Sequence, residues 1–214
     1  MGPTPPLPKR SIIYIDGFNL YYGALKGGPY KWLNLERYFN LLRPNDCIQK
    51  IRYFTALISG SHANNQKAYL QALETLPLVD IIFGKFKVKQ IECQVSGCAI
   101  PPPRFFQSNE EKRTDVNIAL WMLSDAQKNL CEKLILVSGD SDLVPAISMV
   151  KNEYSDKEIT VYIPARNVTR GAAVELRGAA DKNKTLPLQM MHAAQLPAEI
   201  NNCAGQIIRK PLSW

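Results

Sequence analysis

The chain has 214 residues, of which 46% are hydrophobic, and this length favours one domain with a single sizeable core. Lysine and arginine total 26 against 19 acidic residues, so the net charge is +7 and the pI is near 9.1, which suits a polyanionic partner. No stretch approaches the length of a membrane span, and the five irregularly spaced cysteines do not make a disulfide framework. The composition therefore argues against a membrane protein and a disulfide-stapled secreted domain, and we expect a cytoplasmic protein.

The expected elements alternate between strands and helices. Residues 1–10 hold four prolines and two basic residues, which predicts a disordered arm outside the fold. Short apolar runs predict strands at 12–15, 51–58, 79–88, 134–137 and 158–163. Periodic segments predict a helical turn at 20–25 and helices at 34–42, capped by Asn34, and at 61–76, 114–130, 143–151 and 172–180. This order predicts an α/β domain at 11–182 with a mainly parallel central sheet.

Two segments interrupt or follow this pattern. Residues 88–113 lose the periodicity around three consecutive prolines, so we expect an irregular inserted loop or a small hairpin there. Cys93 and Cys98 invite a zinc interpretation, but such a site needs two more ligands, which a homodimer of two such loops would supply. Residues 183–214 are expected to form a C-terminal extension.

Four acidic residues fall where strands end or helices begin. Asp16 follows the first expected strand, Asp140 and Asp142 follow the fourth, and Asp115 begins a long helix. Helix capping is one explanation, with Ser141 or Asp142 as the cap, and the helix dipole alone would favour Asp115. If the first and fourth strands are neighbours, however, the acids converge at the carboxyl edge of the sheet.

Converging carboxylates repel one another unless a cation neutralises them, and ligand sets made only of oxygen select hard ions such as Mg²⁺ or Mn²⁺. Metal ions held in this way activate water and stabilise charge on a phosphodiester. The acids thus predict nuclease chemistry. Neither a P-loop nor a G-x-G-x-x-G run occurs, so a nucleotide-binding sandwich lacks support.

Three blocks of sequence resemble the NYN domains of the PIN-like nuclease superfamily. They read YIDGFNL at 14–20, KRTDVNIA at 112–119 and VSGDSDLVP at 137–145, with a fainter match at 175–181. The resemblance implies a PIN-like three-layer α/β/α sandwich, with a sheet of about five strands, and metal-dependent RNA cleavage. It also implies that the catalytic and metal-binding acids are Asp16, Asp115, Asp140 and Asp142, and Asn19 matches the asparagine of the first motif.

Two neighbours of these acids have alternative roles. Ser138 could support a metal-bound water from a second layer around the ion, or it could be only a packing choice before a glycine turn. Asn117 belongs to the same expected second layer. However, it lies two positions from Asp115 and so does not share its helix face, which favours an approximate capping box with Thr114.

Basic and aromatic residues indicate where RNA would bind. Lys85, Lys87 and Lys89 alternate and so share one strand face, although an ordinary solvated face explains them equally well. Arg104, Lys112 and Arg113 are expected to border the acids, and Arg166 follows the fifth strand. The aromatic residues that could stack unpaired bases are Tyr21, Tyr22, Phe105 and Phe106.

The leading hypothesis is a divalent-metal endoribonuclease that cleaves single-stranded RNA with a metal-activated water, DNA being the less favoured substrate. Its expected cofactor is Mg²⁺ or Mn²⁺, and no membrane partner is expected. The alternative is a non-catalytic RNA-binding or regulatory module of the same fold. A homodimer is compatible with either hypothesis.

Overall fold

A six-stranded parallel sheet forms the centre of the protein. The computed structural model describes residues 7–95, 97–101, 103–166 and 173–214. The six strands lie in the order β3-β2-β1-β6-β7-β8. They are β3 (Val79–Phe83), β2 (Asp46–Thr55), β1 (Lys9–Asp16), β6 (Lys133–Val137), β7 (Glu158–Ile163) and β8 (Lys182–Thr185). All five pairings between neighbours are parallel, which confirms the mainly parallel α/β architecture.

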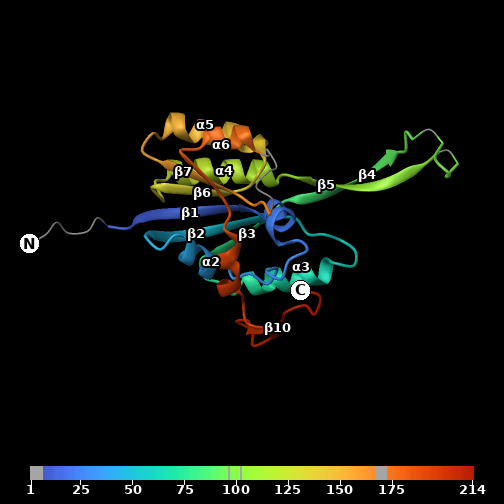
Figure 1. Cartoon of the computed structure of the whole chain (residues 1–214), viewed down its shortest axis with the longest axis horizontal. Helices are drawn as coiled ribbons and strands as arrows, with labels where there is room; N and C mark the ends of the chain where they lie inside the picture. Colours follow the sequence, from blue (N-terminus) through green and yellow to red (C-terminus); the bar gives the residue numbers. More distant parts are fainter. Residues whose placement is uncertain (1–6, 96, 102, 167–172) are drawn as a thin grey trace, which may run out of the picture.

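Helices cover both faces of this sheet and make it the middle of three layers (Figure 1). One outer layer contains α4 (Thr114–Gln127), α5 (Val144–Glu153) and α6 (Val174–Ala179). The other contains α1 (Gly17–Leu20), the π-helix η1 (Tyr21–Leu25), α2 (Leu35–Leu42), α3 (Ala63–Leu73) and the 3-10 helix η3 (Leu188–Ala194). The expected α/β/α sandwich is thus confirmed.

The alternation of β1 divides the core between the two faces. Ile12 and Tyr14 pack in the cluster beneath α4 and α5, whereas Ile13 and Ile15 pack beneath α2 and α3. All four are almost completely buried, as expected for a central strand covered on both sides. Asn34 caps α2 as predicted, since its Oδ1 accepts a hydrogen bond from the backbone N–H of Arg37 at 2.9 Å.

The predicted single strand at 79–88 is wrong. β3 ends at Phe83, and β4 (Lys85–Glu92) leaves the sheet to pair antiparallel with β5 (Phe105–Lys112). Gly84 stands at the point of departure, where a Cβ atom would lie 2.7 Å from Oγ1 of Thr114 and 2.9 Å from the carbonyl oxygen of Lys112. Only glycine fits there without a shift of its neighbours.

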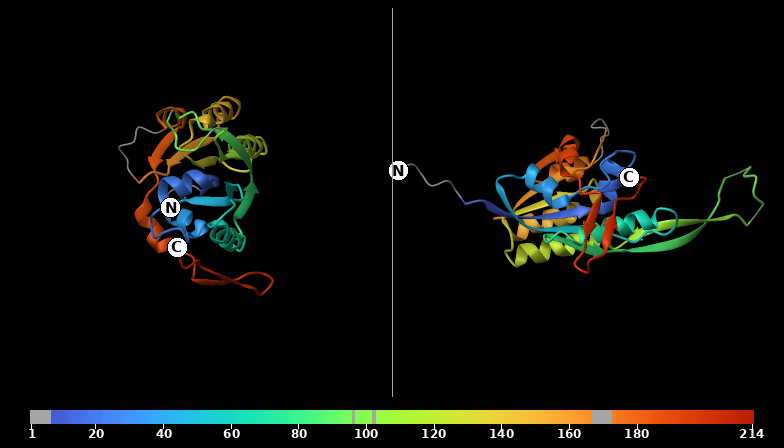
Figure 2. Two further views of the ribbon diagram at one scale, coloured as in Figure 1. Left: turned by 90° about the vertical axis from the view of Figure 1, so that its right-hand side faces the viewer. Right: turned by 90° about the horizontal axis from the view of Figure 1, so that it is seen from below.

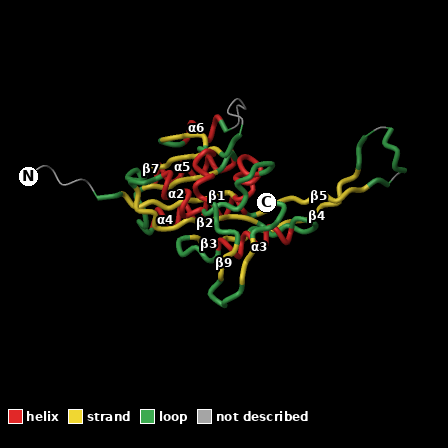
Figure 3. The backbone as a smooth tube through the Cα atoms, turned by 60° about the horizontal axis from the view of Figure 1, so that its bottom comes forward, coloured by secondary structure: helices red, strands yellow, loops and turns green. Residues whose placement is uncertain are grey.

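The β4–β5 ribbon and its connecting loop project far beyond the sandwich (Figures 1 and 2). We call residues 85–112 the hairpin arm. Its strands are paired in continuous register from Lys85 opposite Lys112 to Glu92 opposite Phe105, so the expected irregular insertion is mostly a regular hairpin. The arm leaves the sandwich on the side where the carboxyl ends of the sheet strands lie, and β1 begins on the opposite side (Figure 3).

Both ends of the described chain join the fold more closely than the sequence indicates. Lys9 and Arg10 belong to β1, which corrects the expected boundary of the N-terminal arm, and residues 1–6 of that arm lie outside the described residues. The expected C-terminal extension contributes most of β8, the buried Met191 and Ala194 of η3, and the hairpin of β9 (Glu199–Asn201) and β10 (Ile207–Arg209). Among the described helices, none has the length and apolarity needed to cross a membrane.

Candidate active site

The first and fourth expected strands are neighbours, as the site hypothesis requires. β1 and β6 are adjacent and parallel, with Ile15 opposite Val137. Asp16 and Ser138 therefore emerge side by side at the carboxyl ends of the two central strands. In an open α/β sheet this edge is where ligands bind.

Asp16 is fixed by its surroundings. Its side chain caps α1 by accepting a hydrogen bond at Oδ1 from the backbone N–H of Asn19, at 2.9 Å. Its Oδ2 accepts from Nδ2 of Asn19 at 2.5 Å and from Oγ of Ser138 at 3.3 Å. Burial raises the pKa of Asp16 in spite of these three donors, and the nearby charge of Asp140 raises it further.

A chain of hydrogen bonds extends from Asp16 along the strand end of β6. Oδ1 of Asn19 accepts from the backbone N–H of Gly139 at 3.1 Å, and the backbone N–H of Asp140 donates to Oγ of Ser138 at 3.1 Å. Asp140 in turn accepts from the backbone N–H of Asp142 at 3.0 Å and caps the 3-10 helix η2 (Ser141–Leu143). Asp140 is thus the capping residue, in place of the expected Ser141 or Asp142.

Asp115 lies within electrostatic reach of the other acids. It is half-buried in the first turn of α4, where burial raises its pKa to about 6, with further contributions from the charges of Asp140, Asp16 and Asp142. The structure thus brings the four predicted acids to one edge of the sheet.

A fifth acid, Glu111 at the end of β5, was missed by the sequence patterns. Burial raises the pKa of Glu111 to about 7, and the charges of Asp16 and Asp115 contribute to this increase. The hydrogen bond from Thr114 acts in the opposite direction and lowers the pKa. Its position depends on β5 returning to the sandwich beside Gly84, which the periodicity of the segment does not indicate. Its closeness to the KRTD motif was the one available signal.

The described acids do not form a preassembled coordination sphere. No group of three or more histidine, cysteine, aspartate or glutamate side chains in the described part of the chain is arranged to hold a metal ion. The donor chemistry nevertheless fits a hard cation, because the cluster consists of carboxylates that raise one another's pKa values. Mg²⁺ usually keeps several waters and binds through one or two carboxylates, so it does not require three direct ligands.

Asn117 does not take its expected place in the second layer around the acids. Its Nδ2 lies 3.4 Å from the carbonyl oxygen of Phe83 and donates to it, towards the end of β3. The proposed capping box with Thr114 is also wrong, because α4 begins without a side-chain capping hydrogen bond and Thr114 donates to Glu111 instead. Ser138 fits its expected second-layer position through its contact with Asp16.

The predicted basic residues are spread along the arm. Lys85, Lys112 and Arg113 lie at its base, next to the start of α4, and Lys87 and Lys89 follow outward on an exposed face. Glu110 forms an ion pair with Lys89 at 2.5 Å and another with Lys112, which partly neutralises both lysines.

Arg104 does not border the acids as expected, whereas Arg166 follows β7 as expected. Arg104 lies at the outer end of β5, roughly 25 Å along the strand from Lys112, and its Nη1 donates to the carbonyl oxygen of Val95 at 3.0 Å. Arg166 donates to the carbonyl oxygen of Ala24 at 3.0 Å and so supports the end of η1.

The cysteines of the arm remain free thiols. Cys93 and Cys98 both lie in the loop at its outer end, where the described residues supply no set of three metal ligands. Hydrogen bonds from the backbone of Ile100 and from Arg104 lower the pKa of the Cys98 thiol. The zinc interpretation thus has no support among the described residues of one chain.

Of the four aromatic residues expected to stack bases, two lie near the acids. Tyr21 and Tyr22 belong to η1 and line a pocket that begins at Gly17 and Phe18, directly after Asp16. The other two, Phe105 and Phe106, are exposed at the outer part of the arm.

Comparisons with known proteins agree with this architecture. The curated relative 6-hydroxy-3-succinoylpyridine 3-monooxygenase HspA of Pseudomonas putida (strain DSM 28022 / S16) is 32% identical over 239 residues, covering 97% of this chain and 76% of that protein. The crystal structure of VPA0982, a protein of unknown function from Vibrio parahaemolyticus RIMD 2210633, has a TM-score of 0.55 at 17% identity, covering 85% of this chain and 94% of that one, which supports the fold alone. The NYN domain model matches residues 10–186, and the chain therefore belongs to the NYN domain family.

Proposed function

We propose that this protein is a divalent-metal-dependent ribonuclease that acts on single-stranded RNA. The observation that carries the proposal is the position of Asp16 and Asp140 at the adjacent carboxyl ends of β1 and β6, with Asp115 in the first turn of α4 close enough that, beyond burial, their charges raise its pKa. Carboxylates that destabilise one another in this way favour a cation between them. Membership of a family with a nuclease-like fold supports the same conclusion.

The residues of the site divide into ligands and supports. Asp16, Asp115, Asp140 and Asp142 would hold the cation, directly or through water, and Glu111 adds a fifth carboxylate to the set. Asn19 and Ser138 orient Asp16 through hydrogen bonds of 2.5 and 3.3 Å. A bound Mg²⁺ or Mn²⁺ would lower the pKa of a coordinated water and stabilise the charge that develops on the phosphodiester.

The charge distribution around the acids supports a nucleic-acid substrate. The acids repel phosphate when no metal is present, whereas Lys85, Lys112 and Arg113 at the base of the arm attract the flanking backbone. Aromatic side chains beside the acids favour unpaired bases over a duplex, since stacking requires an exposed ring face.

The test is incubation of the purified protein with a panel of labelled RNAs and matched DNAs, with Mg²⁺, Mn²⁺ or EDTA. We expect metal-dependent cleavage of single-stranded RNA, which Asp140→Asn abolishes. Tight RNA binding without turnover by either metal across the panel would favour the non-catalytic binding module. Absence of both binding and turnover would reject both forms of the proposal.

A second candidate function rests on the relative that is 32% identical across 97% of this chain. We propose as the alternative that the chain oxygenates a hydroxypyridine that carries an acidic side chain, as the name of that relative describes. The test is incubation with 6-hydroxy-3-succinoylpyridine, oxygen and a reduced nicotinamide or flavin, with measurement of substrate loss and oxygen uptake. Consumption of the pyridine in step with oxygen would establish this activity, and an inert pyridine would remove it.

A further inference from the structure

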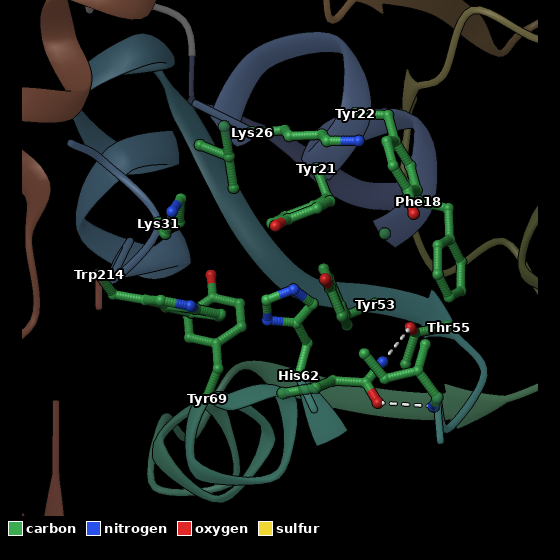
Figure 4. A pocket seen from close by; sticks show the side chains of 14 residues that line it. Phe18, Tyr21, Tyr22, Lys26, Lys31, Tyr53, Thr55, His62, Tyr69 and Trp214 are labelled. Atoms are coloured by element: carbon green, nitrogen blue, oxygen red, sulfur yellow. Dashed lines mark hydrogen bonds between the residues drawn. The ribbon is translucent and has the colours of Figure 1, made fainter. Parts of the chain in front are cut away.

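An aromatic pocket of about 190 Å³ lies beside the acids, at the carboxyl edge of the sheet. Its walls include Tyr21 and Tyr22 of η1, Tyr53 of β2, Tyr69 of α3 and the C-terminal Trp214. Figure 4 shows these rings around the cavity, with His62 among them. Pockets for drug-sized ligands usually measure about 300–1,000 Å³, so this one suits a single small ring system.

The walls are held rigidly by contacts outside the cavity. The hydroxyl of Tyr69 donates to the carbonyl oxygen of Leu33 at 2.9 Å, and its ring packs on Trp214 with centroids 5.6 Å apart. Gln66 closes the floor, since its amide donates to the carbonyl oxygen of Ala56 and accepts from the backbone N–H of Ile58, both at 2.9 Å. The pocket is therefore formed before any ligand arrives.

Tyr53 connects the pocket to the acids. Tyr53 is 6% exposed, lines the cavity, and donates no hydrogen bond to any residue that the structure describes. A Cβ atom on Gly17 would lie 2.7 Å from Cζ of Tyr53, so the ring packs directly against the residue that follows Asp16. A hydroxyl on the pocket wall that donates to no described residue is free to donate to a ligand that supplies an acceptor.

Two lysine side chains line the pocket and give it positive charge. Lys26 and Lys31 both line it, and Nζ of Lys26 lies 4.7 Å from the centre of the Tyr22 ring. Among the described residues that line the cavity, none is acidic. The matching ligand is a planar aromatic ring that bears a hydrogen-bond acceptor and carries an anionic group.

We propose that this pocket is a nucleotide subsite that holds one unstacked base of the RNA, with the adjacent phosphate against Lys26 and Lys31. The inference rests on the proposed ribonuclease function and adds to it the position that selects the cleavage site. The base stacks against Tyr21 and Trp214, which are only partly buried, and its ring carbonyl or ring nitrogen accepts from the hydroxyl of Tyr53. Because Tyr53 packs against Gly17, which directly follows Asp16 in the chain, a base in this pocket brings its scissile phosphate towards the acids.

The first experiment measures binding without turnover. The full chain in EDTA is titrated with uridine 5′-monophosphate and adenosine 5′-monophosphate by calorimetry and tryptophan fluorescence. Uridine lacks the phosphate and ribose 5-phosphate lacks the base. We expect the nucleotides to bind at least about tenfold more tightly than either fragment, because only they use both the rings and the cations. Equal binding of ribose 5-phosphate would overturn the subsite.

Variants separate the two halves of the pocket. Tyr21→Ala should weaken nucleotide binding about fivefold or more by removing a stacking surface. Tyr53→Phe should weaken nucleotide and uridine alike, by about two- to tenfold, because it removes only the hydroxyl. Replacing Lys26 and Lys31 with glutamine should weaken the nucleotide and leave uridine unchanged. Lys67→Gln, on α3 outside the pocket, is the matched control, and an equal effect there would overturn the assignment.

Substrates with one abasic nucleotide connect the pocket to cleavage. In single-stranded RNA with Mn²⁺, an abasic residue at the subsite position should lower kcat/KM about tenfold, whereas one placed elsewhere should not. RNA cleaved equally well with the abasic residue at every position would overturn the subsite and leave the ribonuclease proposal intact.

Nucleotide binding in EDTA without RNA cleavage would support a site for a ring with an anionic group and would reject the ribonuclease proposal. A pyridine carboxylate that binds about tenfold more tightly than either nucleotide would replace RNA as the source of the ring.

Discussion

The side-chain oxygen of Asn19 accepts a hydrogen bond from the backbone N–H of Gly139 at 3.1 Å and thereby joins the ends of β1 and β6. The same side chain donates to Asp16 through its nitrogen at 2.5 Å. One amide therefore fixes both a candidate metal ligand and the turn that carries Asp140. Asparagine suits this position because it offers a donor and an acceptor at once.

Asn19→Ala removes both hydrogen bonds and leaves the buried carboxylate of Asp16 with fewer donors. We expect the free energy of unfolding to fall by about 1–2 kcal/mol, and metal-dependent RNA cleavage to fall by at least about tenfold, in line with the loss of a supporting residue around a metal site. Urea denaturation and single-turnover cleavage assays measure the two effects. Asn117→Ala is the matched control, because its side chain donates to the carbonyl oxygen of Phe83 and to no described acid, and it should retain turnover within about twofold.

Asp115→Asn should stabilise the metal-free protein at neutral pH. Folding raises the pKa of Asp115 from 3.8 to about 6. Between these two pH values the folded protein therefore binds more protons than the unfolded chain does. This carboxylate therefore reduces stability progressively as pH rises through the window, and the reduction is complete above it. The variant should gain on the order of 1 kcal/mol at pH 7.5, after allowance for solvent screening, and almost nothing at pH 3.5.

Thermal melts of both proteins in EDTA at the two pH values check this expectation, and cleavage assays should show that the same variant has lost turnover. A lower melting temperature at pH 7.5 would show that Asp115 serves α4 through the helix dipole instead of a metal.

Lys85 and Lys87 should contribute more to RNA binding than Lys89. Within the described part of the chain neither forms an ion pair, whereas Lys89 pairs with Glu110 at 2.5 Å. Replacing Lys85 and Lys87 with glutamine should reduce the slope of log affinity for single-stranded RNA against log salt concentration by about 0.7 per lost phosphate contact. The reduction should be similar for all RNA sequences. Fluorescence anisotropy between low and high salt measures the slope. Lys182→Gln, at the opposite edge of the sheet, is the control, and an equal change there would contradict a role for the arm.

Asp125→Ala should destabilise the fold without involving the site. Asp125 is fully buried and receives two hydrogen bonds from Arg52 and one from Tyr14, each at 2.8 Å. Its removal leaves the guanidinium buried without its main partner, which typically costs about 3–5 kcal/mol. Asp80→Ala removes a partner of Arg52 whose side chain is 40% exposed and should cost less than about 1 kcal/mol. Chemical denaturation of both variants compares the two costs, and equal costs would show that Arg52 does not depend on Asp125.

The sequence by itself determined the parts of this protein that depend on local pattern. The apolar run from Leu134 to Val137 could only be satisfied by a strand covered on both faces, and the alternation of strands and helices required parallel crossovers. Asn34 indicated the start of α2, because asparagine is a favoured helix N-cap residue. The acids were assigned to one edge because parallel strands end on the same side of a sheet.

Other features depended on the pairing of distant segments, which only the tertiary structure decided. β8 carries the polar sequence KNKT, so it has no apolar signal, and its pairing with β7 defines it as an edge strand. Glu111 joins the acids because β5 pairs with β4 across a loop without periodicity. The aromatic pocket gathers residues 21, 53, 69 and 214, which are unrelated in local pattern. Contacts of this kind are fixed by packing and pairing between segments remote in sequence, and no local propensity encodes them.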